Sequence, residues 1–170
     1  GLGDVYKRQA LFISVLSLNL QSLNVDAVRT AYKEAAQDKT KVNTFYKSLS
    51  VIDPNDNSVL VAYKGASIAL MAKQAKTIKE KKDGFIDGVS HIELAIERSP
   101  NNIEVRFVRL SIQENSPKIL KYKANLDEDK QFILAQFKFI KYAHLKNYLK
   151  DYISHSKVFT DEEKSVILKS

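Results

Sequence analysis

Three planar, hydrogen-bonding side chains share one face of a predicted helix and form the strongest candidate for recognition chemistry in this 170-residue sequence. Arg106, Arg109 and Gln113 have helical spacing, and the other sides of that helix are apolar. In helical repeat arrays such faces often line a concave groove. We therefore predict that these residues bind a peptide or protein partner. The alternative is structural, namely ion pairs with Glu97, Glu114 or an acid from a neighbouring helix.

The histidines show no metal-binding pattern. His91, His144 and His155 are predicted on different helices, and none has the i, i+4 partner or the His/Glu spacing of a metal site. His144 and His155 are expected to approach each other only if the helix between them bends. The chain has no cysteine, which excludes disulfides, thiolate metal sites and thiol catalysis. We predict structural histidines and no metal or cofactor.

Two acidic segments resemble ion-binding or acid-pair sites, but local structural roles explain them better. Residues 53–57 alternate oxygen-bearing side chains as a calcium loop does, yet Ser58 and Lys64 stand where that loop needs glycine and a bidentate glutamate. We interpret this segment as a turn and helix cap. Residues 127–129 open a predicted helix and complement its dipole. Without a glycine-rich phosphate loop or a nucleophile turn, the sequence predicts a protein that is not an enzyme.

The positive charge is unevenly distributed. The formal net charge is +7, and residues 61–123 carry an excess of five positive charges, concentrated at Lys73–Lys82 and Lys118–Lys123. The first cluster supports an alternative function, in which a basic helical module binds nucleic acid or an anionic membrane surface. The other interpretation is a solvated helix face, because the charge is mostly lysine. Residues 137–142 interleave aromatic and basic residues, which we interpret as an ordinary amphipathic helix.

Two proline-containing segments indicate how the helices are connected. Residues 53–57 and 99–102 each end one apolar-periodic segment and begin the next. Proline cannot continue a helix, whereas Asn and Ser cap the helix that follows. Such short connections fold successive helices back on one another. No strand or hairpin pattern is present, so the predicted fold class is all-α, an antiparallel helical array.

The apolar periodicity places the helices approximately. We expect them at 25–36, 40–52, 58–79, 85–98, 102–114, 118–123, 125–140, 142–154 and from 160 onward. The small residues of 58–79 predict an inner helix, and Gly88 predicts a crossing helix close by. The two apolar sides of 102–114 predict a helix packed between partners. Asp83-Gly84 predicts a turn, Asp38 a cap, and Asn125/Glu128 and Thr160/Glu163 have capping-box spacing.

The segment from Tyr63 to Leu110 resembles the tetratricopeptide repeat. The matching residues are Tyr63, Ala66, Ser67 and Leu70 in the first helix and Gly88, Ile92, Ala95 and Pro100 in the second. The loop at 76–87 is longer than in that family, and the two prolines at 54 and 100 are 46 positions apart, whereas the repeat has a period of about 34. The resemblance implies an α-α superhelix that binds proteins or peptides. The whole chain also resembles small exported helical proteins of unknown function from Bacteroidota-type bacteria.

The amino-terminal residues are expected to lie outside the domain. Residues 1–9 look like the translation of a sequencing adaptor. Residues 10–24 include an uncharged apolar run of signal-peptide length, too short to span a bilayer, which favours export to the periplasm; a docked first helix is the alternative. Residues 25–170 are then one all-α domain.

Overall fold

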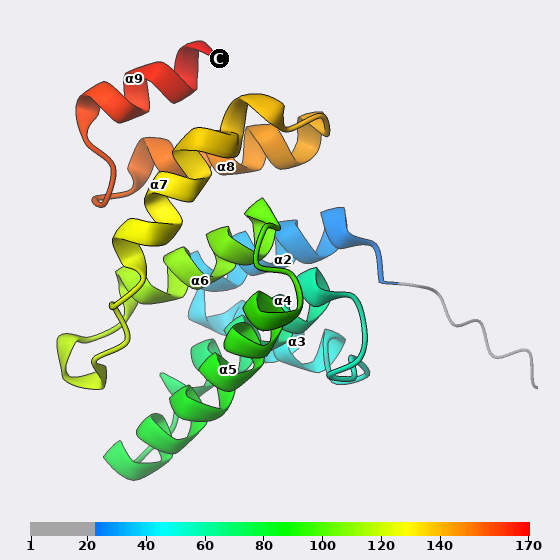
Figure 1. Cartoon of the computed structure of the whole chain (residues 1–170). Coiled ribbons are helices and arrows are strands. Elements are labelled where there is room, and N and C mark those ends of the chain that lie inside the picture. The colour runs from blue at the N-terminus through cyan, green and yellow to red at the C-terminus, as the bar shows by residue number, and fades with distance from the viewer. Residues whose placement is uncertain (1–22) are drawn as a thin grey trace, which may run out of the picture.

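A computed structural model describes residues 23–170, and this part of the chain is all-α, as predicted. The helices are α2 (Val25–Gln37), η1 (Lys39–Lys41), α3 (Val42–Ser48), α4 (Ser58–Ala72), α5 (Ile78–Arg98), α6 (Ile103–Asn115), η2 (Lys118–Leu120), α7 (Leu126–Gln136), η3 (Phe137–Phe139), α8 (Ala143–His155) and α9 (Asp161–Lys169). Figure 1 shows α4 and α5 side by side, α6 next to them, and α7, α8 and α9 on the far side of α6.

Side-chain caps set most of the helix starts. Asn24, Asn57 and Asn102 accept hydrogen bonds from the first-turn amides of α2, α4 and α6, and Asp38 caps η1. The prediction of a turn and cap at 53–57 is therefore confirmed, as is the cap at Asp38. The predicted capping box of Thr160 with Glu163 is also present.

Two expected helix boundaries and one expected capping box were wrong. Helix α4 ends at Ala72, and a capping box of Thr77 with Glu80 begins α5 at Ile78. The turn expected at residues 83 and 84 is therefore helical. Asn125 makes no capping box, because its side chain donates to the Glu128 carboxylate instead of accepting a backbone amide.

Helices α4 and α5 approach each other through two glycines. A Cβ atom at Gly88 would lie 2.7 Å from the Ala69 backbone nitrogen and 2.7 Å from the Gly65 carbonyl oxygen. A Cβ at Gly65 would lie 2.4 Å from the Gly88 carbonyl oxygen. Only glycine allows this backbone contact. The prediction that another helix crosses at Gly88 is confirmed.

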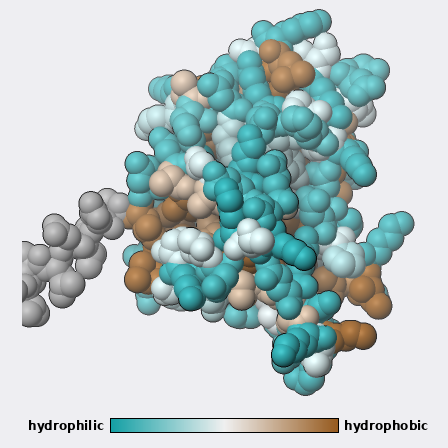
Figure 2. Space-filling model, turned by 180° about the vertical axis from the view of Figure 1, so that it is seen from behind, coloured by the Kyte–Doolittle hydropathy of each residue, from teal (hydrophilic) through white to brown (hydrophobic). Residues whose placement is uncertain are grey.

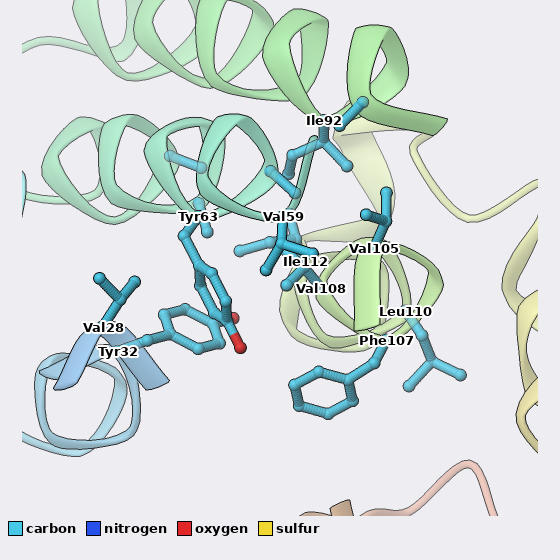
Figure 3. Close-up of a cluster of buried hydrophobic side chains, with 14 of the residues drawn as sticks. Val28, Tyr32, Val59, Tyr63, Ile92, Val105, Phe107, Val108, Leu110 and Ile112 are labelled. Carbon is cyan, nitrogen blue, oxygen red and sulfur yellow. The ribbon is translucent and has the colours of Figure 1, made fainter. Parts of the chain in front are cut away.

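Helix α6 is the centre of the fold. Every residue from Glu104 to Gln113 is buried, as the two apolar sides predicted. Its neighbours are α4 and α5 on one side and α7 on the other, and apolar side chains from α2, α4, α5 and α6 form one cluster (Figure 3). Helix α4 is also buried along most of its length, which confirms the prediction of an inner helix.

The interleaved segment 137–142 is not the amphipathic helix that was expected. Helix α7 ends at Gln136, η3 follows, and Ile140 has extended backbone. Phe137 is buried, but Phe139 is 62% exposed and Tyr142 is 77% exposed. The interruption turns these two aromatic rings outward, whereas a continuous helix would have carried the apolar stripe inward.

The predictions of an adaptor at residues 1–9 and of most of a signal peptide at residues 10–24 lie outside the described part of the chain. Within residues 23–170, no helix has the length and apolar character needed to cross a bilayer.

The glycine contact gives a first prediction. Gly88→Ala is expected to lower the free energy of unfolding by about 1–3 kcal/mol, because the new methyl group meets backbone atoms that cannot move independently. The gain in helix propensity, ~1 kcal/mol, offsets only part of this cost. Urea denaturation measures the change. Ser90→Ala, at an exposed position on the same helix, is the control and should shift stability by less than about 0.5 kcal/mol. Equal effects of the two variants would contradict the close contact.

Candidate functional site

The predicted binding face on α6 is covered by α7 and paired with acids of the chain itself. Arg109 donates two hydrogen bonds of 2.7 Å to the carboxylate of Asp129, and its Nη1 donates to Glu93 of α5 at 3.0 Å. Asp129 is 0% exposed. Burial by itself lowers the pKa of Arg109, but the bonds to Asp129 outweigh it and raise that pKa, so the guanidinium stays charged.

Arg106 and Gln113 are also buried on this face. Arg106 donates to Asp129 at 2.9 Å, to the Pro100 carbonyl at 2.7 Å and to the more exposed Glu128. Gln113 is 1% exposed, and neither atom of its amide finds a hydrogen-bond partner within residues 23–170. A partner could reach Arg106 and Arg109 only if α7 moved away, and Gln113 is closed to solvent as well.

The two arginines therefore form structural ion pairs, which was the alternative prediction. Their partners are acids of neighbouring helices, and neither Glu97 nor Glu114 is among them. The pairs form with Glu93, Glu128 and Asp129. Residues 127–129 therefore do more than complement a helix dipole, because Asp129 joins α7 to α6.

A second buried ion pair lies on the opposite side of α6. Glu104 receives two hydrogen bonds from Arg29 of α2, at 2.6 and 2.7 Å, and a third from the Tyr63 hydroxyl of α4 at 2.9 Å. Burial and the neighbouring Glu104 hold the pKa of Tyr63 well above its usual value, so the hydroxyl remains a donor. This cluster fixes α2 and α4 against α6.

A third polar cluster, at the end of α6, is open to solvent. The Glu114 carboxylate accepts hydrogen bonds from the Tyr152 hydroxyl at 2.5 Å, from the Ser156 hydroxyl at 2.8 Å and from the Lys157 backbone amide at 2.7 Å. It borders a recess of about 230 Å³, which we call the tyrosine recess. The recess is lined by Tyr32, Lys33, Ala36, Gln37, Glu114, Asn115, Tyr148, Asp151, Tyr152, His155 and Ser156.

The tyrosine recess continues into a groove between α2 and α8. An outer recess of about 430 Å³ adjoins it and is lined by Thr30, Lys33, Glu34, Gln37, His144, Asn147, Tyr148 and Asp151. Lys33 Nζ lies 2.8 Å from Asp151, and His144 Nδ1 lies 3.2 Å from Asp26. Lys33 follows Asp26 by seven residues on α2, and Asp151 follows His144 by seven residues on α8, which is about two helical turns in each case. The two helices therefore run parallel. We call both recesses together the α2–α8 groove.

The histidines are arranged differently from the prediction. His144 and His155 stand at opposite ends of one helix, α8, so the expectation of separate helices was wrong for this pair. His91 lies on α5. Within residues 23–170, no group of three or more His, Asp or Glu side chains is placed to hold a metal ion.

The Lys73–Lys82 cluster spans the end of α4 and the start of α5. Ile78 is 87% exposed in its midst, and Lys79 pairs with Asp83 at 2.5 Å. Within the described residues, Lys76, Lys81 and Lys82 pair with no acid. In Figure 2, apolar residues form separate small areas on a mainly hydrophilic surface.

Sequence reasoning missed the residues that line the α2–α8 groove. Tyr148 and Tyr152 fit the apolar stripe of α8, a pattern that predicts core positions, yet both are only half-buried. Their i, i+4 spacing, with Asp151 between them, was the available signal for a mixed aromatic and acidic face. The pairing of α2 with α8 had no signal, because the two helices are far apart in sequence.

No protein-family model, no curated protein and no solved structure matches this chain.

Asp129 provides a prediction for the buried network. Asp129→Asn keeps the side-chain shape but leaves two buried guanidinium groups without their shared carboxylate. It should therefore lower the free energy of unfolding by about 3–5 kcal/mol. The matched control is Asp127→Asn, at an exposed position two residues earlier, which should cost less than about 1 kcal/mol. Thermal and urea unfolding measure both. Similar losses for the two variants would show that α7 does not depend on the ion pairs.

Proposed function

We propose that this chain is a non-enzymatic interaction module whose α2–α8 groove receives a peptide segment of a partner protein. The observation that carries the proposal is the groove itself, in which two adjoining recesses run between parallel helices. Both offer aromatic surface and hydrogen-bonding side chains, which is the usual composition of a specific recognition surface.

The two sides of the groove, α2 and α8, are joined by charge pairs at the surface. In the Lys33–Asp151 pair, both side chains are more than two-fifths exposed. Such pairs contribute little to stability, so a ligand could replace them at small cost. In contrast, the buried arginine pairs of α6 are closed and cost several kcal/mol to open. These differences favour the α2–α8 groove over the face of Arg106, Arg109 and Gln113.

Two further proposals accompany this function. A tetratricopeptide-like origin fits the α4–α5 hairpin, in which small residues interlock at Gly65 and Gly88, and that family binds peptides in grooves. Export to the periplasm is supported by the apolar run of residues 10–20 in the sequence. The groove proposal does not depend on either of them.

A groove-filling variant tests the function. Peptides selected from a random display library on the purified chain should lose at least about tenfold in affinity for Ala36→Trp, because the indole would occupy the tyrosine recess. Ala36 is exposed, so the substitution removes no buried group. Fluorescence polarisation with labelled peptides measures the affinity.

The control is Ala124→Trp, an exposed position that lines neither recess. Its affinity should stay within about twofold of that of the unmodified chain, a difference of less than ~0.5 kcal/mol. Selected peptides that bind Ala36→Trp as tightly as the unmodified chain would overturn the proposal, as would a selection that yields no binding peptide.

A second function rests on the Lys73–Lys82 cluster, where Ile78 is exposed and where Lys76, Lys81 and Lys82 have no acidic partner within the described residues. A basic surface with an apolar tip suits an anionic membrane, and lysines alone also suit a nucleic-acid backbone. Lys73 shares a small recess with Tyr32 and Ala36 of the groove, whereas Lys76, Lys79, Lys81 and Lys82 line no part of the groove. This function would therefore be additional to peptide binding or replace it.

Salt titration tests the second function. Affinity for duplex DNA or for phosphatidylserine vesicles should fall at least about tenfold between about 50 and 200 mM salt if the cluster binds phosphate groups. Lys81→Gln/Lys82→Gln should weaken it, whereas Lys118→Gln/Lys121→Gln, with the same loss of charge elsewhere, should not. Absence of binding at low salt would exclude this function.

A further inference from the structure

The tyrosine recess combines three tyrosine rings with the carboxylate of Glu114. Tyr32 comes from α2, Tyr148 and Tyr152 come from α8, and Glu114 comes from the end of α6. Lys33 and Asp151, which pair with each other, and His155 also line it. Its volume of about 230 Å³ lies below the ~300–1,000 Å³ of sites for drug-sized molecules, so it suits one small group or a single side chain.

The aromatic walls are held in place before any ligand arrives. The rings of Tyr148 and Tyr152 pack edge-to-face against Phe107, with centroids 5.3 and 4.9 Å away. The Tyr32 hydroxyl is hydrogen-bonded to Ser111 at 2.7 Å. Burial raises the pKa of Tyr32 to about 12 and also raises those of Tyr148 and Tyr152, so all three rings stay neutral at physiological pH. Neutral phenol rings present a negative π face.

The carboxylate of Glu114 differs from the other acids on α6 and its partners. Glu104 and Asp129 are each bonded to arginine, but all three donors to the Glu114 carboxylate are neutral. The Lys123 ammonium donates to the backbone carbonyl of Glu114 at 3.0 Å. Within residues 23–170, no cation lies in salt-bridge distance of the carboxylate.

A fixed negative charge beside neutral aromatic faces is complementary to an organic cation. The ring quadrupoles attract an ammonium group, with a benefit that grows when the site is desolvated, and the carboxylate supplies the counter-charge. Aromatic cages that bind alkylated ammonium groups use the same combination. A neutral ligand would gain less than a cation from the charge of Glu114, and an anion would be repelled by it.

We propose that the tyrosine recess binds an alkylammonium group. This inference deepens the proposed function and rests on it, because the recess is the inner part of the α2–α8 groove. The group is either the side chain of a lysine in the bound peptide or a free amine. In both cases it lies against Tyr148 and Tyr152 with its charge toward Glu114.

The first test uses choline and its neutral isostere, 3,3-dimethylbutan-1-ol, on the full chain. Choline should produce saturable amide shifts in two-dimensional ¹H–¹⁵N NMR spectra that centre on the end of α6 and on α8. The isostere has the same shape without the charge and should bind at least about tenfold more weakly. This comparison needs no substitution and so does not depend on the folding of a variant.

Matched variants locate the charge. Glu114→Gln keeps an oxygen that accepts from Tyr152 and Ser156 but removes the charge, and it should weaken choline binding at least about tenfold. Glu97→Gln is the control, because Glu97 is exposed on α5 and lines neither recess of the groove. It should leave choline binding within about twofold. Near-ultraviolet circular dichroism confirms the fold of each variant.

The source of the ammonium group follows from two more probes. An acetylated and amidated lysine tripeptide that binds at least about tenfold more tightly than n-butylamine identifies a peptide side chain, and the reverse order identifies a free amine. Equal binding of choline and its isostere, or no saturable shift with choline and n-butylamine, would overturn the inference. If the inference fails in this way but Ala36→Trp still weakens the binding of the selected peptides, the proposed groove function stands without the ammonium site.

Discussion

Helix α6 must satisfy several polar and charged side chains while it is buried from Glu104 to Gln113, and the rest of the fold depends on this constraint. An isolated charge in the interior is far too costly, so each needs a partner in a fixed position. Arg29 of α2 meets Glu104, and Asp129 of α7 meets Arg106 and Arg109. Such pairs add little net stability over apolar packing, but they define where each neighbouring helix lies.

The local pattern of the sequence was sufficient to predict the fold class and most helices, because periodicity and caps act within one or two turns. Gly88 even indicated the close helix contact that Gly65 completes. The boundary between α4 and α5 failed because Gly84 was given more weight than the capping box of Thr77 with Glu80. The break after Gln136 was missed for a related reason. The apolar stripe continues beyond Gln136, although the α-helical backbone ends there.

The candidate site was much less predictable. A face with Arg106 and Arg109 has the same sequence pattern whether its partner is another protein or a later helix of the same chain, and only the fold shows that Asp129 arrives there. Conversely, Tyr148 and Tyr152 follow a core-like period, yet they border a groove because α2 and α8 meet through polar pairs. Periodicity reports which side of a helix is apolar, and it contains no information on which helix covers that side.

Glu114 shows why the two ends of α6 have different consequences. At Glu104 a guanidinium cancels the charge and fills the hydrogen-bonding capacity, so that cluster is complete. At Glu114 the neutral donors Tyr152 and Ser156 orient the carboxylate without cancelling its charge. A carboxylate held in this way retains an electrostatic field in a recess that solvent only partly screens. In the interior of α6, each charged side chain has a partner within the chain. At the exposed end, the charge of Glu114 has none in the described part of the chain, so this is where a cation from outside the chain is favoured.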